Sequence, residues 1–194
     1  MQFKGGYNVQ IKGKPSNKIT KLPDPDLLYL PLFSKRFTFS AFCIHDGNEV
    51  VQGQILAEDP DNHSVPLLAP RAGTAKIDPE TNHIVLENIQ ASQEAPKVEF
   101  ELPDTAKGMG ETGEKRCRLL KLGVWQFFSD AFSGDLPDPF GSPQAVIVSA
   151  AHLEPFLTSF EALLSEGTAE FEKGLEQIHS LAQAQKFYVI LPKI

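Results

Sequence analysis

The chemically most suggestive spacing in the chain is the glycine pattern of residues 108–113, GMGETG, which has the form GxGxxG. Glycines at this spacing let a backbone turn approach the pyrophosphate of a dinucleotide, provided that the turn directly follows a strand and opens a helix. Here residues 103–107 separate the glycines from the nearest predicted strand, and Glu111 puts a negative charge where pyrophosphate would lie. We therefore interpret the pattern as part of a flexible linker, and a nucleotide site is kept as the alternative.

Residue types that bind metals are scattered along the chain. Cys43 and His45 can share one strand face, because side chains two residues apart point the same way. Two ligands do not make a zinc site, so a core cysteine beside an exposed histidine is expected. Asp59, Asp61 and His63 gather at a predicted turn, where Asp is a common turn former, and a weak cation site is the alternative. No metal site, no nucleophile elbow and no catalytic residue is predicted.

A cluster of aromatic residues lies in the second half of the chain. Its members are Trp125, Phe127, Phe128 and Phe132. We interpret the cluster as a buried helix face, and contact of these rings with a quinone or a membrane partner is the alternative. Under that alternative, Trp125 and Phe128 are candidate cofactor-binding residues.

The first 102 residues predict many short strands, since apolar runs alternate with turn-rich segments. Strands at such close spacing are typical of a β-sandwich or a small barrel. In the second run, Phe37, Phe39 and Ala41 share one face, which predicts one buried side of that strand. The runs are residues 27–31, 37–44, 54–57, 65–69, 73–77, 84–89 and 98–102.

The second half of the chain predicts helices between buried parallel strands. Residues 117–128 have helical spacing, with Leu120, Val124 and Phe127 on one apolar stripe. Residues 145–149 and 187–191 are continuous apolar runs, which are typical of parallel strands. Between them we expect a helix over 154–165 and a second one with Thr168 as N-cap, whose apolar stripe is Phe171, Leu175, Ile178 and Leu181.

One right-handed crossover gives a single pair of parallel strands, and such a pair needs further strands and cover. The α/β part is therefore expected to be incomplete, with the strand near Phe187 at a sheet edge and with Phe187 and Val189 incompletely covered. The predicted fold class is α+β. A β domain over residues 1–102 is followed by a linker over 103–113 and a partial, Rossmann-like α/β domain over 114–194.

The composition of the 194 residues is that of a globular protein, with 41% hydrophobic and 22% charged residues. A net charge of −7 leaves no basic stripe, so nucleic-acid binding is not expected. Two isolated cysteines favour a reducing, cytoplasmic compartment. The N-terminus lacks the apolar core of a signal peptide, and no apolar run approaches the roughly 18 residues that span a bilayer. Membrane association is therefore expected only through a partner.

Two segments, residues 47–58 and 69–75, resemble the barrel-sandwich hybrid motif of biotinyl and lipoyl domains. Gly47 and Gly53 are placed for tight turns and residues 70–73 for another, while an unrelated β-sandwich is the alternative. Carrier domains of this fold attach their cofactor to a lysine at a hairpin tip, which here would fall at residues 61–63. No lysine occurs between Gly53 and Ala75, so a structural module is expected rather than a swinging arm.

Four further segments carry a resemblance, namely residues 4–15, 120–125, 145–150 and 153–158. With them the chain resembles the NqrA family, whose members are subunits of the sodium-translocating NADH:quinone reductase, and more distantly RnfC. The resemblance implies a peripheral subunit on the cytoplasmic face of the cell membrane, which contributes to electron transfer from NADH to quinone coupled to sodium export. It implies the other reductase subunits as partners, with quinone as a further one. NADH, quinone and flavin are implied for the whole complex and no cofactor for this chain.

RnfC and the flavoprotein subunit of complex I hold FMN with a glycine-rich loop after the position of Gly123. This chain has bulky residues at 126–132, which cannot cradle a phosphate as glycines do. Tight binding of FMN or NADH is therefore not expected. Glu154, which precedes Pro155, matches the flavin-side segment of the relatives and joins Trp125 and Phe128 as a candidate. The alternative functions are a non-catalytic assembly module and an RnfC-like flavin- and NADH-binding electron-transfer subunit.

Overall fold

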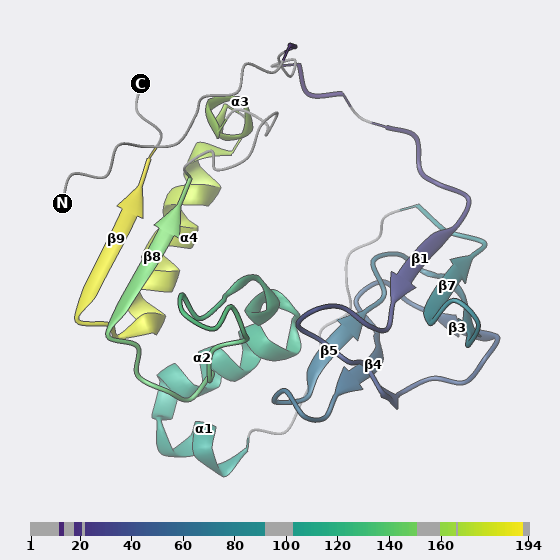
Figure 1. Cartoon of the computed structure of the whole chain (residues 1–194), viewed down its shortest axis with the longest axis horizontal. Coiled ribbons are helices and arrows are strands. Elements are labelled where there is room, and N and C mark those ends of the chain that lie inside the picture. Colours follow the sequence, from purple (N-terminus) through teal and green to yellow (C-terminus); the bar gives the residue numbers. More distant parts are fainter. Residues whose placement is uncertain are drawn as a thin grey trace. The chain divides into compact units, whose positions relative to one another are not determined.

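The computed structural model describes residues 12–13, 18–20, 22–91, 103–150, 160–165 and 167–191. The strand predicted at 98–102 lies outside these residues. Two compact units are present, one spanning Pro23–Gly141 and another that includes Ser142–Ile194, and each is described by itself (Figure 1). Mixed α and β structure with several antiparallel strand pairs agrees with the predicted α+β class.

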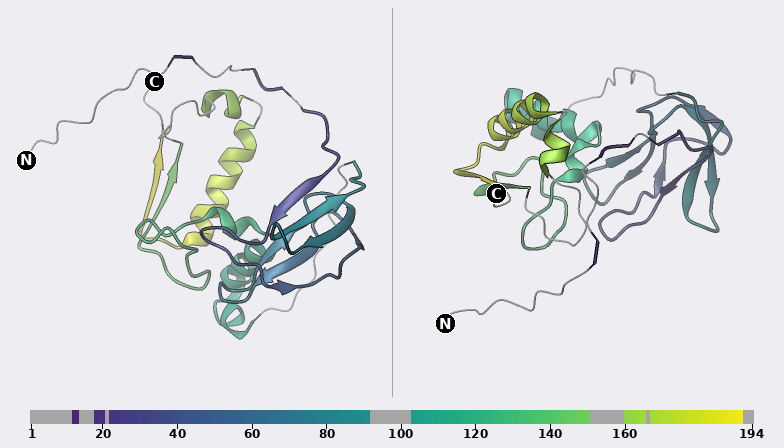
Figure 2. Two further views of the ribbon diagram at one scale, coloured as in Figure 1. Left: turned by 45° about the vertical axis from the view of Figure 1, so that its right-hand side comes forward. Right: turned by 90° about the horizontal axis from the view of Figure 1, so that it is seen from above.

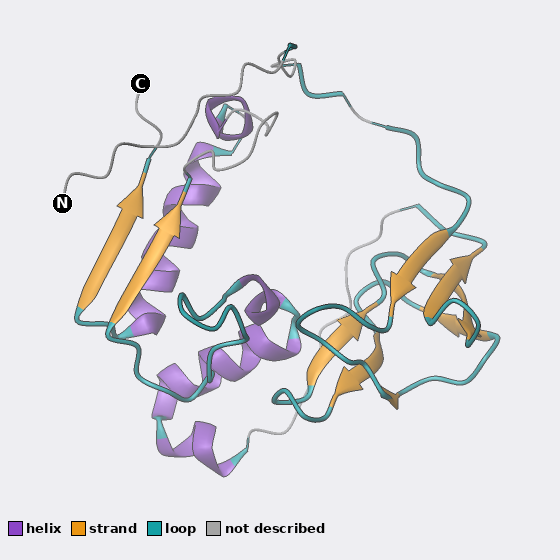
Figure 3. Cartoon of the chain, viewed as in Figure 1, coloured by secondary structure: helices purple, strands orange, loops and turns teal. Residues whose placement is uncertain are grey.

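The strands of the Pro23–Gly141 unit form two antiparallel sheets (Figure 3). The order in the first is β1 (Leu28–Pro31), β7 (His83–Glu87), β6 (Gly73–Asp78) and β3 (Asn48–Val50). The order in the second is β2 (Ala41–Phe42), β4 (Ile55–Asp59) and β5 (Val65–Leu68). The prediction of many short strands is confirmed for the described residues.

One hydrophobic core joins the two sheets, because side chains of both enter the same cluster. Leu56 and Val65 of the second sheet, and Ile84 and Leu86 of the first, are completely buried in it. The predicted apolar face of residues 37–41 is confirmed in part. Phe39 is buried and stacks on Phe37 at 5.8 Å between ring centroids, whereas Ala41 is exposed.

The expected linker over residues 103–113 is helical instead. It contains α1 (Asp104–Gly108) and the start of α2 (Gly110–Lys121). The glycine pattern has a packing explanation, since a Cβ on Gly113 would overlap the carbonyl oxygen of Ala106 and lie 2.9 Å from its carbonyl carbon. A polar, glycine-rich composition is typical of a flexible linker. In this chain the glycine at position 113 instead permits a close contact between α1 and α2.

The predicted helix over residues 117–128 is interrupted. α2 ends at Lys121, Gly123 takes the left-handed conformation at φ +72°, and the chain continues as the 3-10 helix η1 (Val124–Phe127). This break changes the phase of the side chains. Leu120 is buried as predicted, but Val124 and Phe127 are exposed, so the predicted apolar stripe is wrong beyond Leu120.

The other unit contains a pair of parallel strands and two helices. Its elements are β8 (Ala145–Ser149), α3 (Phe160–Leu164), α4 (Thr168–Ala182) and β9 (Lys186–Ile190). Figure 2 shows the two strands side by side with α4 along one face. There the ring of His179 meets that of Phe187 edge-on, at 5.0 Å between centroids.

The apolar stripe predicted for α4 is confirmed, since Phe171, Leu175, Ile178 and Leu181 are its covered apolar positions. The predicted cap is wrong. Gly167 occupies the N-cap position, and the hydroxyl of Thr168 donates to the carbonyl oxygen of Leu164 at 2.8 Å. Of the helix predicted over 154–165, the structure describes α3, and residues 154–159 lie outside the described residues.

Within the described residues, β8 and β9 pair only with each other. Phe187 is partly covered and Val189 is exposed, as predicted for a strand at a sheet edge. Ile147 and Tyr188 are register partners, and both are about half exposed. Within the described residues, the strand pair therefore presents apolar side chains beside edges that no third strand pairs. The predicted incompleteness of the α/β part stays a prediction.

Candidate functional site

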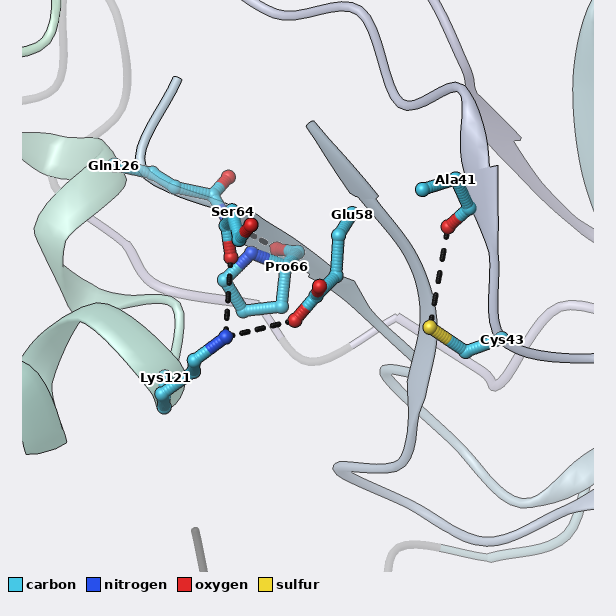
Figure 4. A network of polar contacts seen from close by, with 7 residues as sticks. All are labelled: Ala41, Cys43, Glu58, Ser64, Pro66, Lys121 and Gln126. Carbon is cyan, nitrogen blue, oxygen red and sulfur yellow. Dashed lines mark hydrogen bonds and ion pairs between the residues drawn. The ribbon is translucent and has the colours of Figure 1, made fainter. Parts of the chain in front are cut away.

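Polar contacts fix α2 and η1 against the β4–β5 hairpin (Figure 4). The ammonium of Lys121 lies 2.8 Å from the carboxylate of Glu58 and donates to the carbonyl oxygen of Ser64 at 3.4 Å. The side-chain amide of Gln126 donates to the carbonyl oxygen of Pro66. Because both side chains of the ion pair are at least three-quarters buried, the pair is less screened than a surface salt bridge. These contacts give η1 a defined position.

Arg36 secures the end of η1 from a segment far away in the sequence. Its guanidinium donates to the carbonyl oxygen of Gln126 at 3.1 Å and to that of Phe128. The same group lies over the ring of Phe37, 5.1 Å from the centroid, which is a cation–π arrangement. Carbonyl groups at the end of a helix have no intrahelical donor, so Arg36 supplies the missing hydrogen bonds.

Trp125 belongs to the hydrophobic core, and the partly buried Phe128 packs against that core. Trp125 is only 8% exposed, and its indole N–H donates to the carbonyl oxygen of Pro137 at 2.9 Å. Its ring meets that of Phe128 in a T-shaped contact with 5.0 Å between centroids. For these two candidate residues the geometry supports the interpretation as a buried helix face. The third candidate, Glu154, lies outside the described residues.

The other two aromatic residues of the predicted cluster are exposed. Phe127 is 88% exposed and Phe132 is 100% exposed. Transferring one phenyl ring from water to an apolar environment stabilises it by about 1.5–3 kcal/mol. Burial of either exposed ring in a complex would therefore contribute to the free energy of binding. The structure therefore divides the predicted cluster into a packing pair and an exposed pair.

Phe127 borders an open groove of about 370 Å³ between η1 and the β4–β5 hairpin. Gly123 is required in its wall, because its φ is +72° and a Cβ there would lie 3.1 Å from Cδ1 of Leu68. Sequence reasoning missed this groove, since its two walls are more than fifty residues apart in the sequence. The lining is mainly apolar and consists of Gln52, Gly53, Leu67, Leu68, Ala69, Pro70, Leu122, Gly123, Val124, Gln126 and Phe127.

Arg116 is a buried cation that sequence reasoning also missed. It is 2% exposed, and its guanidinium donates to the carbonyl oxygens of Pro139 at 3.2 Å and Gly141 at 2.6 Å. Burial lowers the pKa of Arg116, while the nearby carboxylate of Asp138 acts in the opposite direction. Arg116 therefore holds the segment that follows the exposed Phe132 against α2.

Comparisons with known proteins identify the relatives of this chain. Residues 112–193 match the family model described as NqrA second alpha/beta domain. Over 185 residues the chain is 25% identical to NqrA, a subunit of the Na(+)-translocating NADH-quinone reductase, from Pseudomonas aeruginosa strain PAO1. The chain is a relative of NqrA. The resemblance to NqrA seen in the sequence is thereby confirmed.

Further NqrA sequences match to a similar extent. The chain is 24% identical over 188 residues to NqrA of Neisseria gonorrhoeae strain NCCP11945, and 27% identical over 195 residues to that of Glaesserella parasuis. These two alignments cover 94% and 95% of this chain, and the alignment with the Pseudomonas NqrA covers 94%. They cover only 42%, 41% and 42% of the Pseudomonas, Neisseria and Glaesserella relatives, so the chain spans about two fifths of the length of NqrA.

None of the helices formed by the described residues of this NqrA relative has the length and apolar character needed to cross a membrane. Those residues also contain no group of three or more His, Cys, Asp or Glu side chains placed to hold a metal ion. The turn-former interpretation of the acidic cluster is supported. The carboxylate of Asp59 is buried and accepts hydrogen bonds from the amides of Thr38 at 2.9 Å and Asp61 at 3.2 Å.

The expected core position of Cys43 is wrong. Ile44 is the buried residue of this segment, and period two therefore turns both Cys43 and His45 outward. The pKa of the Cys43 thiol is nevertheless raised, first by partial desolvation and then by the negative charge of Glu58, with Lys121 opposing. Desolvation also raises the pKa of Cys117, which is buried.

These two environments predict different reactivities for the two thiols. Cys43 is expected to react with a thiol reagent in the native state, although slowly at pH 7, because the thiolate is the reacting form. Cys117 is expected to react only after unfolding. Titration with a chromogenic disulfide should count one thiol in buffer and two in denaturant, and peptide mapping should place the first label on Cys43. Rapid native labelling of Cys117 would contradict the described packing of α2.

The predicted hairpin tip at residues 61–63 lies in the connection between β4 and β5. His63 and Ser64 lie there in the left-handed region, at φ +56° and +50°. Because no lysine is present between Gly53 and Ala75, we predict that biotin and lipoyl ligases do not modify this chain. Intact mass after expression with active ligases should equal the mass of the unmodified chain. A gain equal to one lipoyl or biotinyl group would contradict the interpretation as a structural module.

Proposed function

We propose that this chain serves in a peripheral subunit of a sodium-translocating NADH:quinone oxidoreductase, at the cytoplasmic face of the cell membrane. There it contributes to electron transfer from NADH to quinone, coupled to sodium export. The observation that carries the proposal is the similarity to NqrA subunits of such reductases over 94% of the chain. The proposal transfers the function of those relatives to this chain, which spans about two fifths of their length.

The described residues support a role that depends on contact with other molecules. Phe127 and the apolar groove beside it present a surface that suits a partner subunit or the ring of a quinone. Gly47 and Gly53 have φ values of +79° and +81°, which agrees with the turn positions of a barrel-sandwich hybrid. We therefore also propose that fold for the β sheets, and a partial Rossmann-like fold for the strand pair with α4.

Purification from the source organism tests the proposed function. A chromosomally tagged chain should copurify from detergent-solubilised membranes with the other reductase subunits and with NADH-driven, sodium-dependent quinone reduction. Deletion of the gene should abolish that activity, and the wild-type gene should restore it. Purification without any reductase subunit, together with full activity in the deletion strain, would refute the proposal.

A non-catalytic assembly module is the second candidate, and the complete exposure of Phe132 favours it. The same deletion strain separates the two roles. Loss of the assembled complex from native gels indicates an assembly module. A complex that still forms but no longer reduces quinone indicates a direct role in electron transfer.

We predict that the purified chain binds neither FMN nor NADH tightly. Residues 126–132 replace the glycines that would cradle a phosphate, and Gly113 is committed to the contact with Ala106. Visible absorption should show no flavin, and calorimetry should detect no NADH binding at low micromolar concentration. Stoichiometric flavin in the preparation would instead favour the RnfC-like alternative.

A further inference from the structure

The loop over residues 129–135, here called the Phe132 loop, has a hydrogen-bonded backbone that carries the exposed ring of Phe132. The amide of Asp130 donates to the carbonyl oxygen of Asp135 at 2.8 Å, and the amide of Gly134 donates to the carbonyl oxygen of Asp130 at 2.9 Å. Inside the loop, the carboxylate of Asp130 accepts from the amides of Phe132 and Ser133, both at 2.9 Å. The loop is therefore closed by its own hydrogen bonds.

Both ends of the Phe132 loop are anchored in the core. Phe128 packs on Trp125 before the loop, and Leu136 is buried directly after it. The indole of Trp125 holds Pro137 by a hydrogen bond. The complete exposure of Phe132 is thus a property of an ordered loop with two fixed ends. Because the backbone that carries the ring is already ordered, little backbone entropy is lost on binding, which favours the use of Phe132 as an anchor in an interface.

The charges around Phe132 indicate the chemistry of the partner. Residues 129–141 contain Asp130, Asp135 and Asp138 and no Lys, Arg or His. The backbone amides of Ser133 and Phe132 lower the pKa of Asp130, so its carboxylate is charged at neutral pH. The carboxylates of Asp130 and Asp135, two and three residues from Phe132, disfavour insertion of the loop into an anionic membrane. They also disfavour a second copy of this chain, whose net charge is −7.

We propose that the Phe132 loop docks this chain onto another subunit of the reductase, with the ring of Phe132 in an apolar pocket and with Lys or Arg side chains of that subunit facing Asp130 and Asp135. The inference rests on the proposed function for the identity of the complex. The contacting residues and the charge of the expected partner are inferred from the Phe132 loop. Neutral substitution of the carboxylates weakens the attraction, whereas truncation of the ring removes the anchor.

Binding to membrane vesicles tests the docking loop. The probes are vesicles of the source organism that carry the reductase without this chain, vesicles of a strain without any reductase subunit, and protein-free vesicles of phosphatidylcholine and phosphatidylglycerol. Wild-type chain should bind the first and neither of the others. Phe132→Ala should weaken that binding about 30-fold or more, as expected for an interface anchor. Phe33→Ala, at another exposed phenylalanine of the same unit, should bind as wild type.

The double substitution Asp130→Asn with Asp135→Asn tests the charge complementarity. An amide oxygen still accepts the loop hydrogen bonds, so the fold should persist while the salt dependence of binding becomes shallower. Equal binding of wild type and Phe132→Ala to reductase vesicles would overturn the inference and leave the proposed function standing. Absence of any wild-type binding to them would refute both. Phe132-dependent binding to protein-free vesicles, or Phe132-dependent self-association, would overturn the inference in favour of lipid or of a second copy.

Discussion

Gly113→Ala is expected to destabilise the Pro23–Gly141 unit by about 2–3 kcal/mol, in the upper part of the roughly 1–3 kcal/mol that overpacking a well-packed site costs. An added methyl group would overlap the carbonyl oxygen of Ala106 and approach the Cβ of Met109 to 2.8 Å. Ala106 is completely buried, so α1 cannot move away without exposing it. The expected result is a lower midpoint of urea unfolding. The fluorescence of Trp125, the single tryptophan of the chain, reports this unfolding.

Gly108→Ala is the matched control, since Gly108 belongs to the same helical hairpin and to the same glycine pattern. A Cβ at Gly108 would meet no atom within 4 Å. Replacing glycine by alanine at an unstrained helical position raises stability by about 0.4–1 kcal/mol, mainly through the unfolded state. The two substitutions should therefore change the free energy of unfolding in opposite directions. A destabilisation of similar size in both would show that the close contact between α1 and α2 is absent.

Local patterns in the sequence predicted the helices and strands. The features that those patterns missed depend on contacts between residues distant in the sequence. The strands over 84–89 and 145–149 and the apolar stripe of α4 follow from periodicity within a few residues, and they are present. The helical contact of Gly113 depends on Ala106 and on the folding of α1 back onto α2. No property of the six residues 108–113 alone separates such a contact from a flexible linker.

The aromatic cluster shows the same limit of sequence reasoning at the candidate site. Its four residues were found from composition, but their division depends on the helix break at Gly123. A continuous helix would have placed Phe127 with Leu120 on one face. The break turns Trp125 inward and Phe127 outward. The hydrogen bonds of Arg36 to residues 126 and 128 span about ninety positions, which no local pattern contains.

Trp125 connects the core to both exposed aromatic residues, because η1 presents Phe127 and the hydrogen bond to Pro137 holds the end of the Phe132 loop. Its substitutions are expected to form a graded series. Trp125→Ala should destabilise the unit by about 3–5 kcal/mol, the usual effect of truncating a buried tryptophan. Trp125→Phe keeps an aromatic ring beside Phe128 but leaves the carbonyl oxygen of Pro137 without its donor, which costs about 1–3 kcal/mol.

Phe127→Ala is the control in the same 3-10 helix, and it should change stability by less than about 0.5 kcal/mol because the ring is largely in water. Urea unfolding followed by far-ultraviolet circular dichroism measures all three variants without the tryptophan signal. Trp125→Phe should also weaken vesicle binding under conditions where the chain remains folded, because one end of the Phe132 loop is released and its anchor is no longer preorganised. If Trp125→Ala and Phe127→Ala were equally stable, Trp125 would not be a core residue, and the ordered ends of the Phe132 loop would lose their physical basis.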